Sequence, residues 1–174
     1  MSALSTLGQV HTLISLVAVG AGIVSFASYR KINPGSRSGM LYIWTTVLTC
    51  LTGFGIFAHG GWGAPHTLGV ITLVTLAAAY SAGNGEFFGR AAPYVEVVAY
   101  SATFLFHMIP AITETSTRLP VGAPWLANAE APELKAATGV LFLLFLAGSA
   151  LQVRSLRVRL DQLLSNPVVT KGTV

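Results

Sequence analysis

Four histidines are the side chains of this 174-residue chain whose chemistry could include metal binding or proton transfer. They are His11, His59, His66 and His107. Imidazole nitrogens bind zinc, copper and haem iron, and imidazole also gains and loses a proton near neutral pH. A metal site needs several such ligands together, whereas a b-type haem needs two opposed histidines. The chemistry open to the four therefore depends on the elements that carry them.

Those elements are predicted to be membrane-spanning helices. Hydrophobic residues make up 53% of the chain and charged residues 9%, and the mean hydropathy is +0.67, which exceeds the usual range of a soluble domain. A helix needs about 20 apolar residues to cross the bilayer, and the apolar stretches are too long and continuous for barrel strands. The sequence predicts an all-α, polytopic transmembrane helical bundle that forms one integral membrane domain, residues 1–174. Its expected spans, about five in number, are 8–29, 39–58, 66–83, 93–113 and 136–153.

The positive charges predict how this bundle is oriented. Eight of the ten Lys and Arg residues fall on one side of the threaded chain, namely Arg30, Lys31, Arg37, Arg90, Arg154, Arg157, Arg159 and Lys171. Arg118 and Lys135 fall on the other. Cytoplasmic loops carry the excess of positive charge, so the N-terminus is expected outside and the C-terminus in the cytoplasm of the inner (cytoplasmic) membrane. The basic charge brackets apolar spans, so no nucleic-acid partner is predicted.

This threading places all four histidines toward the outer side. At a helical rise of about 1.5 Å per residue, His11 and His66 lie roughly 25–29 Å above the cytoplasmic end of their spans, His107 roughly 21 Å and His59 roughly 33 Å. A copper or zinc site is predicted from His11, His66 and His107 with His59 or Glu114. A b-type haem is predicted to use His11 and His66, which match best in depth. The alternative for each histidine is a simple hydrogen bond to a neighbouring hydroxyl, and for His59 an interfacial position.

The fourth apolar stretch carries a polar stripe. Glu96, Tyr100, Thr103, His107 and Glu114 recur at spacings of 4, 3, 4 and 7 residues, which puts them on one helical face. Because carboxylates are costly in lipid, this face is expected to point into the bundle, where it would relay protons or line a cofactor slot. The alternative is that the two glutamates are hydrated at the interfaces while the hydroxyls join helices. Threonines of the second span, including Thr46 and Thr52, are likewise expected to form interhelical hydrogen bonds.

Several motifs resemble those of a known family. They are His11, the run Ser28-Tyr29-Arg30-Lys31, the run Gly39-Met40-Leu41-Tyr42, and the stretch from Phe106 to Thr115 followed by Arg118-Leu119-Pro120. Over residues 10–115 the chain resembles uncharacterised bacterial multi-pass membrane proteins of the DUF2306 type. It has Ser36-Arg37 where those proteins carry a His-Arg pair. The resemblance implies a multi-pass topology and, because the group has no settled activity, little about function.

Three functions from different classes are consistent with these features. The first is a small redox or metal-handling protein that binds a transition metal or b-type haem. The second is a non-catalytic accessory or assembly subunit that binds other subunits of a membrane complex through the outer loop 114–135. Residues 154–174, after the last span, are predicted to form a cytoplasmic tail. The third is an enzyme or proton-coupled carrier that works through the stripe from Glu96 to Glu114. It is the least favoured, because HxxxH-type histidine groups, inverted repeats and GxSxG, P-loop or HExxH motifs are not found in the sequence.

Overall fold

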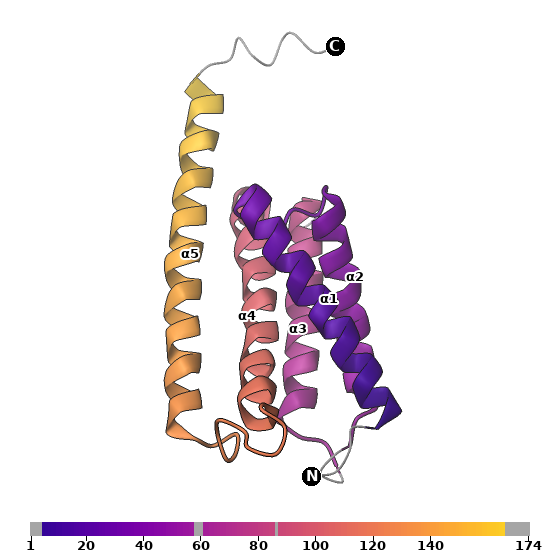
Figure 1. Ribbon diagram of the computed structural model, residues 1–174. Coiled ribbons are helices and arrows are strands. Elements are labelled where there is room, and N and C mark those ends of the chain that lie inside the picture. The colour runs from indigo at the N-terminus through magenta and orange to yellow at the C-terminus, as the bar shows by residue number, and fades with distance from the viewer. Residues whose placement is uncertain (1–4, 58–60, 86, 166–174) are drawn as a thin grey trace.

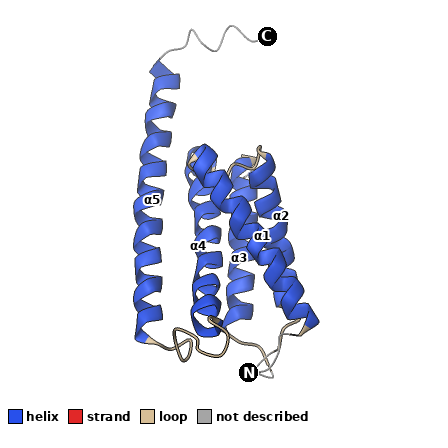
Figure 2. Ribbon diagram, viewed as in Figure 1, coloured by secondary structure: helices blue, strands red, loops and turns tan. Residues whose placement is uncertain are grey.

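The computed structural model describes residues 5–57, 61–85 and 87–165. These residues form five α-helices and one short 3-10 helix, and no strand occurs among them (Figures 1 and 2). The elements are α1 (Thr6–Tyr29), α2 (Arg37–Gly53), α3 (Ala64–Gly83), η1 (Gly89–Ala91), α4 (Ala92–Arg118) and α5 (Pro132–Ser165). The all-α prediction is confirmed.

Four of the described helical segments are long and apolar enough to cross a membrane. They are Thr6–Tyr29, Ala64–Gly83, Gly89–Arg118 and Pro132–Ser165. Helix α2 has 17 residues and ends at Gly53, so the span expected over 39–58 is shorter than predicted. Such a length stands at the lower limit of about 17–25 residues for a membrane helix. The chain therefore has the composition and helix lengths of a multi-pass membrane protein.

Helices α4 and α5 extend beyond the apolar stretches from which the spans are predicted, because a helix does not stop where its hydrophobicity stops. Helix α4 continues past residue 113 to Arg118, and the side chains of Glu114 and Arg118 form an ion pair one turn apart. The outer loop 114–135 consequently shrinks to residues 119–131. Helix α5 continues to Ser165, so the described part of the predicted tail, residues 154–165, is helical. Leucine, arginine and glutamine are good helix formers, and no Gly or Pro interrupts this segment.

Helices α1 to α4 pack together, and α5 stands beside α4 (Figure 1). The start of α1 and the loop between α4 and α5 lie at one end of the bundle, while the loop between α1 and α2 lies at the other. From its contact with α4, α5 extends well past the ends of the other helices at that second end. In the predicted orientation the first end faces outward and the second faces the cytoplasm.

The core lies where α1, α2, α3 and α4 meet. It contains two fully buried tyrosines, Tyr42 and Tyr100, among small and aliphatic residues. Gly22 lets α1 approach α4 closely, because a Cβ there would stand 2.6 Å from the Phe104 ring. Large apolar side chains such as Leu13, Val74 and Leu143 are exposed on the outside of the bundle, as expected for a surface that faces lipid.

Candidate functional site

His107 is the centre of a buried hydrogen-bonded cluster. It lies in the middle of α4 and is 7% exposed. Its Nε2 atom is 3.0 Å from the hydroxyl of Thr46 on α2, which is completely buried. The edge of the imidazole meets the Tyr42 ring, with the centroids 5.9 Å apart. The sequence-based expectation that this face of α4 points into the bundle is confirmed for His107.

The cluster continues through two more hydroxyls. The Tyr42 hydroxyl lies 2.8 Å from the Thr103 hydroxyl and also interacts with Thr46. The Thr103 hydroxyl donates its hydrogen to the backbone carbonyl of Tyr100 at 2.8 Å. A hydroxyl has one hydrogen, so Thr103 accepts from Tyr42. We call Tyr42, Thr46, Thr103 and His107 the hydroxyl network.

His11 lies near the start of α1, toward the end of the bundle that carries the α4–α5 loop. Its Nδ1 atom is 3.1 Å from the Thr52 hydroxyl, which itself donates to the backbone carbonyl of Leu48 at 2.8 Å. The Thr52 oxygen therefore accepts, and His11 donates from Nδ1. The half-buried His11 interacts electrostatically with both His107 and Glu114. Gly53 gives the ring its space, since a Cβ at this position would stand 3.2 Å from Cε1 of His11.

His66 has a different environment. It is 5% exposed, and its ring is stacked against Phe57 at 5.1 Å and against Trp62 at 4.9 Å between centroids. The backbone N–H of Gly63 donates to its Nδ1 at 3.1 Å, which caps the start of α3. The proton of the neutral ring is then on Nε2, and this buried atom has no hydrogen-bond partner among the residues that the structure describes. In this arrangement Nε2 is a donor and offers no lone pair to a metal ion.

The polar stripe of α4 divides into a buried middle and two accessible ends. Tyr100 and Thr103, like His107, are buried. At the end near the α4–α5 loop, the Glu114 side chain is more than half exposed and pairs with Arg118. At the opposite end of α4, Glu96 packs against Gly83 of α3, where an added Cβ would stand 3.2 Å from its carboxylate oxygen. The middle of the stripe faces the bundle interior as predicted, whereas Glu114 is accessible, as the alternative interpretation expects.

The structure brings together only part of the histidine cluster predicted from the sequence. Within residues 5–57, 61–85 and 87–165, no group of three or more His, Cys, Asp or Glu side chains is placed to hold a metal ion. His11, His107 and Glu114 share one neighbourhood, whereas His66 belongs to the aromatic stack of Phe57 and Trp62. The prediction for His59 falls outside the described residues.

The outer loop is folded back onto the end of α4. The backbone N–H of Leu126 donates to the carbonyl of Ser116, and that of Trp125 donates to the carbonyl of Leu119, both at 3.0 Å. The side chains of Val121 and Trp125 remain 85% and 70% exposed. The loop thus presents exposed apolar side chains at this end of the bundle.

The role of α2 in the site was not predicted in this detail. Tyr42 was noted only as part of the family resemblance, and Thr46 only as one of several hydroxyls. Their spacing contains the missing signal, because Tyr42, Thr46, Thr49 and Gly53 lie 4, 3 and 4 residues apart on one face of the helix. Ser36, at the position where the resembled family has a histidine, caps α2 by accepting a hydrogen bond from the Gly39 N–H.

Comparison with family models, with curated proteins and with solved structures gives no match. The resemblance to proteins of the DUF2306 type stays a prediction. The chemistry of the site is therefore inferred from the contacts of its own residues.

Proposed function

We propose that the chain is a multi-pass protein of the inner (cytoplasmic) membrane whose histidines and hydroxyl network relay protons between the outer face and the middle of the bilayer. The orientation, with the N-terminus outside, is supported by the eight-to-two distribution of basic residues. The four long apolar helices support the membrane location. Ionisable residues inside a membrane bundle are costly and usually serve a function, such as a proton relay.

One observation carries this proposal: His107 is buried inside the bundle and joined at 3.0 Å to Thr46, which is part of a series of hydroxyls. Imidazole binds and releases protons near neutral pH, and each hydroxyl both accepts and donates a hydrogen bond. A proton that arrives at His107 can be handed to Thr46 while the Thr46 hydrogen moves on to Tyr42. The Tyr42 hydrogen in turn moves to Thr103, so that the Thr46 and Tyr42 oxygens each gain one proton and lose one. Thr103 balances its gain by releasing its own hydrogen, which leaves the bond to the Tyr100 carbonyl and moves toward the cytoplasmic half of the stripe.

The outer end of the relay is formed by Glu114 and His11. Glu114 is more than half exposed, so water reaches its carboxylate, and the half-buried His11 is coupled electrostatically to both Glu114 and His107. Two positively charged imidazoles in this region would repel each other. The pair therefore favours one added proton at a time, which is a suitable property for a transfer site.

The proposal covers the outer half of the membrane. Among the described residues, no hydrogen bond joins Thr103 to the carboxylate of Glu96. Tyr100 and Glu96 interact electrostatically at the cytoplasmic half of the stripe. These two residues are the groups to which a continuation of the relay would lead.

Proton flux into liposomes tests the relay. Purified protein is reconstituted into vesicles that contain a pH-sensitive dye, and a potassium diffusion potential drives protons inward. We expect wild-type vesicles to acidify faster than empty ones, the variant His107→Phe to lose this difference, and His66→Phe to keep it. Tyr42→Phe, which preserves the ring packing, should also slow the flux. Equal rates for wild-type and empty vesicles, or full flux in His107→Phe, would refute the relay.

The binding of a transition metal or b-type haem stays a separate prediction. It is tested on the detergent-purified protein by absorption spectra of the oxidised and dithionite-reduced states, together with elemental analysis for iron, copper and zinc. A Soret band would point to haem, and a stoichiometric metal without that band would point to a histidine site. The relay is favoured over this role because Nε2 of His107 is already bonded to Thr46, and because no group of three or more possible metal ligands occurs among the residues that the structure describes.

A role as an accessory or assembly subunit is favoured by the exposed apolar side chains of the outer loop, Val121 and Trp125. A partner subunit would cover them. Purification from native membranes in a mild detergent tests this role. Migration in a larger assembly that is lost in a Val121→Ser, Trp125→Ser double variant is the expected result, and a solitary wild-type protein is the contrary one.

A further inference from the structure

The overhanging end of α5 begins at a well-defined level. Gln152 donates from Nε2 to the backbone carbonyl of Arg30 and accepts from the Ser101 hydroxyl, both at 2.9 Å. Arg30 caps the end of α1, so Gln152 lies at the cytoplasmic end of the bundle in the proposed orientation. The 13 residues that follow, 153–165, extend this helix by about 20 Å beyond that level. The first turns past Gln152 thus fall in the headgroup layer of the cytoplasmic leaflet.

One face of α5 changes character at the same level. On the bilayer side, Val140, Leu144 and Leu151 follow one another along this face at helical spacing, and all three are exposed. Gly148 lies next to the same line, and an added Cβ there would meet nothing within 4 Å. This half of the face is an exposed apolar strip that runs along the helix, as an acyl chain beside it would.

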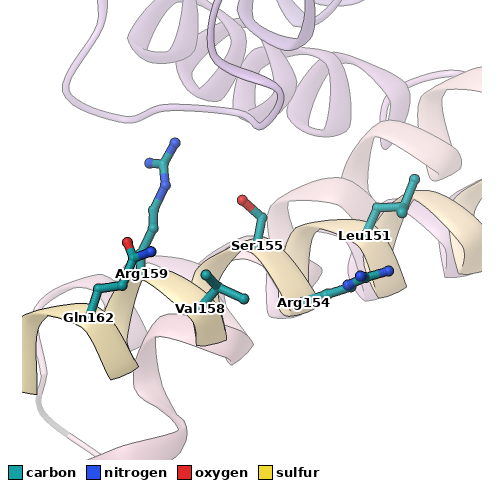
Figure 3. Close-up of a pocket in the computed structure, with 6 residues that line it drawn as sticks. All are labelled: Leu151, Arg154, Ser155, Val158, Arg159 and Gln162. Atoms are coloured by element: carbon teal, nitrogen blue, oxygen red, sulfur yellow. The ribbon is translucent and has the colours of Figure 1, made fainter. Parts of the chain in front are cut away.

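Past Gln152 the same face becomes polar and cationic. A shallow hollow lies on this part of the helix (Figure 3). It is lined by Leu151 and, past Gln152, by Arg154, Ser155, Val158, Arg159 and Gln162. By the helical period, Arg154 and Arg159 flank the line of Ser155 and Gln162 on its two sides. Both guanidinium groups belong to exposed residues, and each can donate hydrogen bonds to phosphate oxygens.

The end of α5 past Gln152 carries more positive than negative charge. Arg154, Arg157 and Arg159 stand against one acidic residue, Asp161. The ion pairs found among the described residues, Arg118 with Glu114 and Lys135 with Glu130, both lie at the opposite end of the molecule. An anionic partner is therefore expected here.

We propose that this face of α5 binds an anionic phospholipid of the cytoplasmic leaflet, with its phosphate between Arg154 and Arg159 and an acyl chain along Leu151, Leu144 and Val140. A phospholipid matches both halves of the face in their order along the helix. Its acyl chain is apolar and lies within the bilayer, and its phosphate is anionic and lies at the surface. An acidic protein would match the arginines alone. This site is separate from the proton relay, and it rests on the cytoplasmic placement of the end of α5.

The test measures lipid retention in detergent, where no proton gradient exists, so that its outcome is independent of the relay. Native mass spectrometry compares the wild-type protein with phosphatidylglycerol or phosphatidylcholine of identical acyl chains. We expect preferential retention of phosphatidylglycerol, a decrease of roughly fivefold in affinity for Arg154→Gln or Arg159→Gln, and of roughly thirtyfold for the double variant. Arg157→Gln is the matched control, because it removes the same charge from the same helix end but away from the hollow.

Several outcomes would overturn the proposal. Equal retention of the two lipids would show that the headgroup charge is not recognised. An equal loss in Arg157→Gln would reduce the effect to net charge. Competition by soluble glycerol phosphate at matched concentration would indicate a site for free phosphate, and displacement by an oligoglutamate peptide with no lipid retained would indicate an acidic protein partner. Thermal unfolding without lipid verifies that each variant is folded.

Discussion

His107 and His66 are almost equally buried, at 7% and 5% exposure, and yet their surroundings differ in kind. His107 is hydrogen-bonded through Nε2 to Thr46 and interacts electrostatically with His11. His66 is packed between Phe57 and Trp62, and no other described residue forms a hydrogen bond with its Nε2 atom. Burial alone therefore does not identify a functional histidine. The groups with which its nitrogens can exchange protons decide that question.

The difference also lies in what each ring does for the fold. Through Thr46, His107 links α4 to α2 across 61 residues of sequence. His66 acts locally, because its Nδ1 caps the first turn of its own helix through Gly63, three residues away. We thus expect His107 to contribute to helix association and His66 chiefly to the geometry of the turn before α3.

Replacing each histidine by phenylalanine should give the largest contrast. In His107→Phe, the Thr46 hydroxyl loses its partner and a larger ring is forced against Tyr42, so we expect the free energy of unfolding to fall by about 2–3 kcal/mol. His66→Phe gives up the bond to Gly63 but removes a desolvated N–H and keeps an aromatic ring in the stack, so its cost should stay within about 1 kcal/mol. Reversible unfolding in mixed micelles measures both. Equal losses would mean that the two environments do not differ energetically.

Two glycines extend the comparison, since each makes room for a ring in one of the two regions. A Cβ at Gly69 would stand 2.9 Å from the Phe54 ring, which stacks on Trp62, and a Cβ at Gly53 would stand 3.2 Å from the ring of His11. We expect Gly69→Ala to cost about 1–2 kcal/mol and to change the tryptophan emission. Gly53→Ala should cost about 1 kcal/mol or less and leave the emission unchanged.

Gly20 provides the control for these alanine substitutions. A Cβ at this position of α1 would meet nothing within 4 Å. Alanine is the better helix former by about 0.5–1 kcal/mol, so Gly20→Ala should leave stability unchanged or raise it. A loss as large as that of Gly69→Ala would show that close ring contacts are not the cause.

The hydroxyl of Tyr42 allows a smaller and cleaner test of the network. Tyr42→Phe keeps the ring against His107 and removes the hydroxyl that bonds to Thr103 and interacts with Thr46, so we expect a loss of about 0.6–1.7 kcal/mol, in the range of interhelical bonds within membranes. Thermal unfolding in detergent provides the measurement. Tyr80→Phe, at a residue that is 63% exposed, should change nothing. A silent Tyr42→Phe would remove Tyr42 from the network.

The sequence predicted the helices far better than their ends. Apolar runs located all five helices, because a segment that buries its backbone polar groups in lipid has to be helical. The ends of α2, α4 and α5 differ from the ends of these runs, because a helix ends through capping and turn residues that hydropathy does not record. The ion pair of Glu114 with Arg118, which accompanies the last turn of α4, is such a local feature.

The site was predicted in part, for a related reason. The stripe on α4 gave the direction in which His107 faces, since helical spacing fixes which residues share a face. Depth along a span, however, contains no information on how a helix is rotated about its own axis. His11 and His66 were matched by depth, whereas the structure gives them separate partners, Thr52 for the first and Gly63 for the second.

The smallest expected effect on stability comes from two threonines, Thr52 and Thr67, whose hydroxyls each accept one hydrogen bond from a ring N–H. Thr52→Val removes the acceptor of the His11 Nδ1–H, and Thr67→Val removes that of the Trp62 indole N–H at 3.2 Å. Each variant loses one accessible bond between side chains, and Thr52→Val also loses the bond from its hydroxyl to the Leu48 carbonyl within α2. Both should cost about 0.5 kcal/mol in micelle unfolding. Proton flux in vesicles should fall for Thr52→Val alone, because a mispositioned His11 weakens the link between Glu114 and His107. If both variants conduct equally, His11 has no part in the relay, and the path to His107 must begin at another residue.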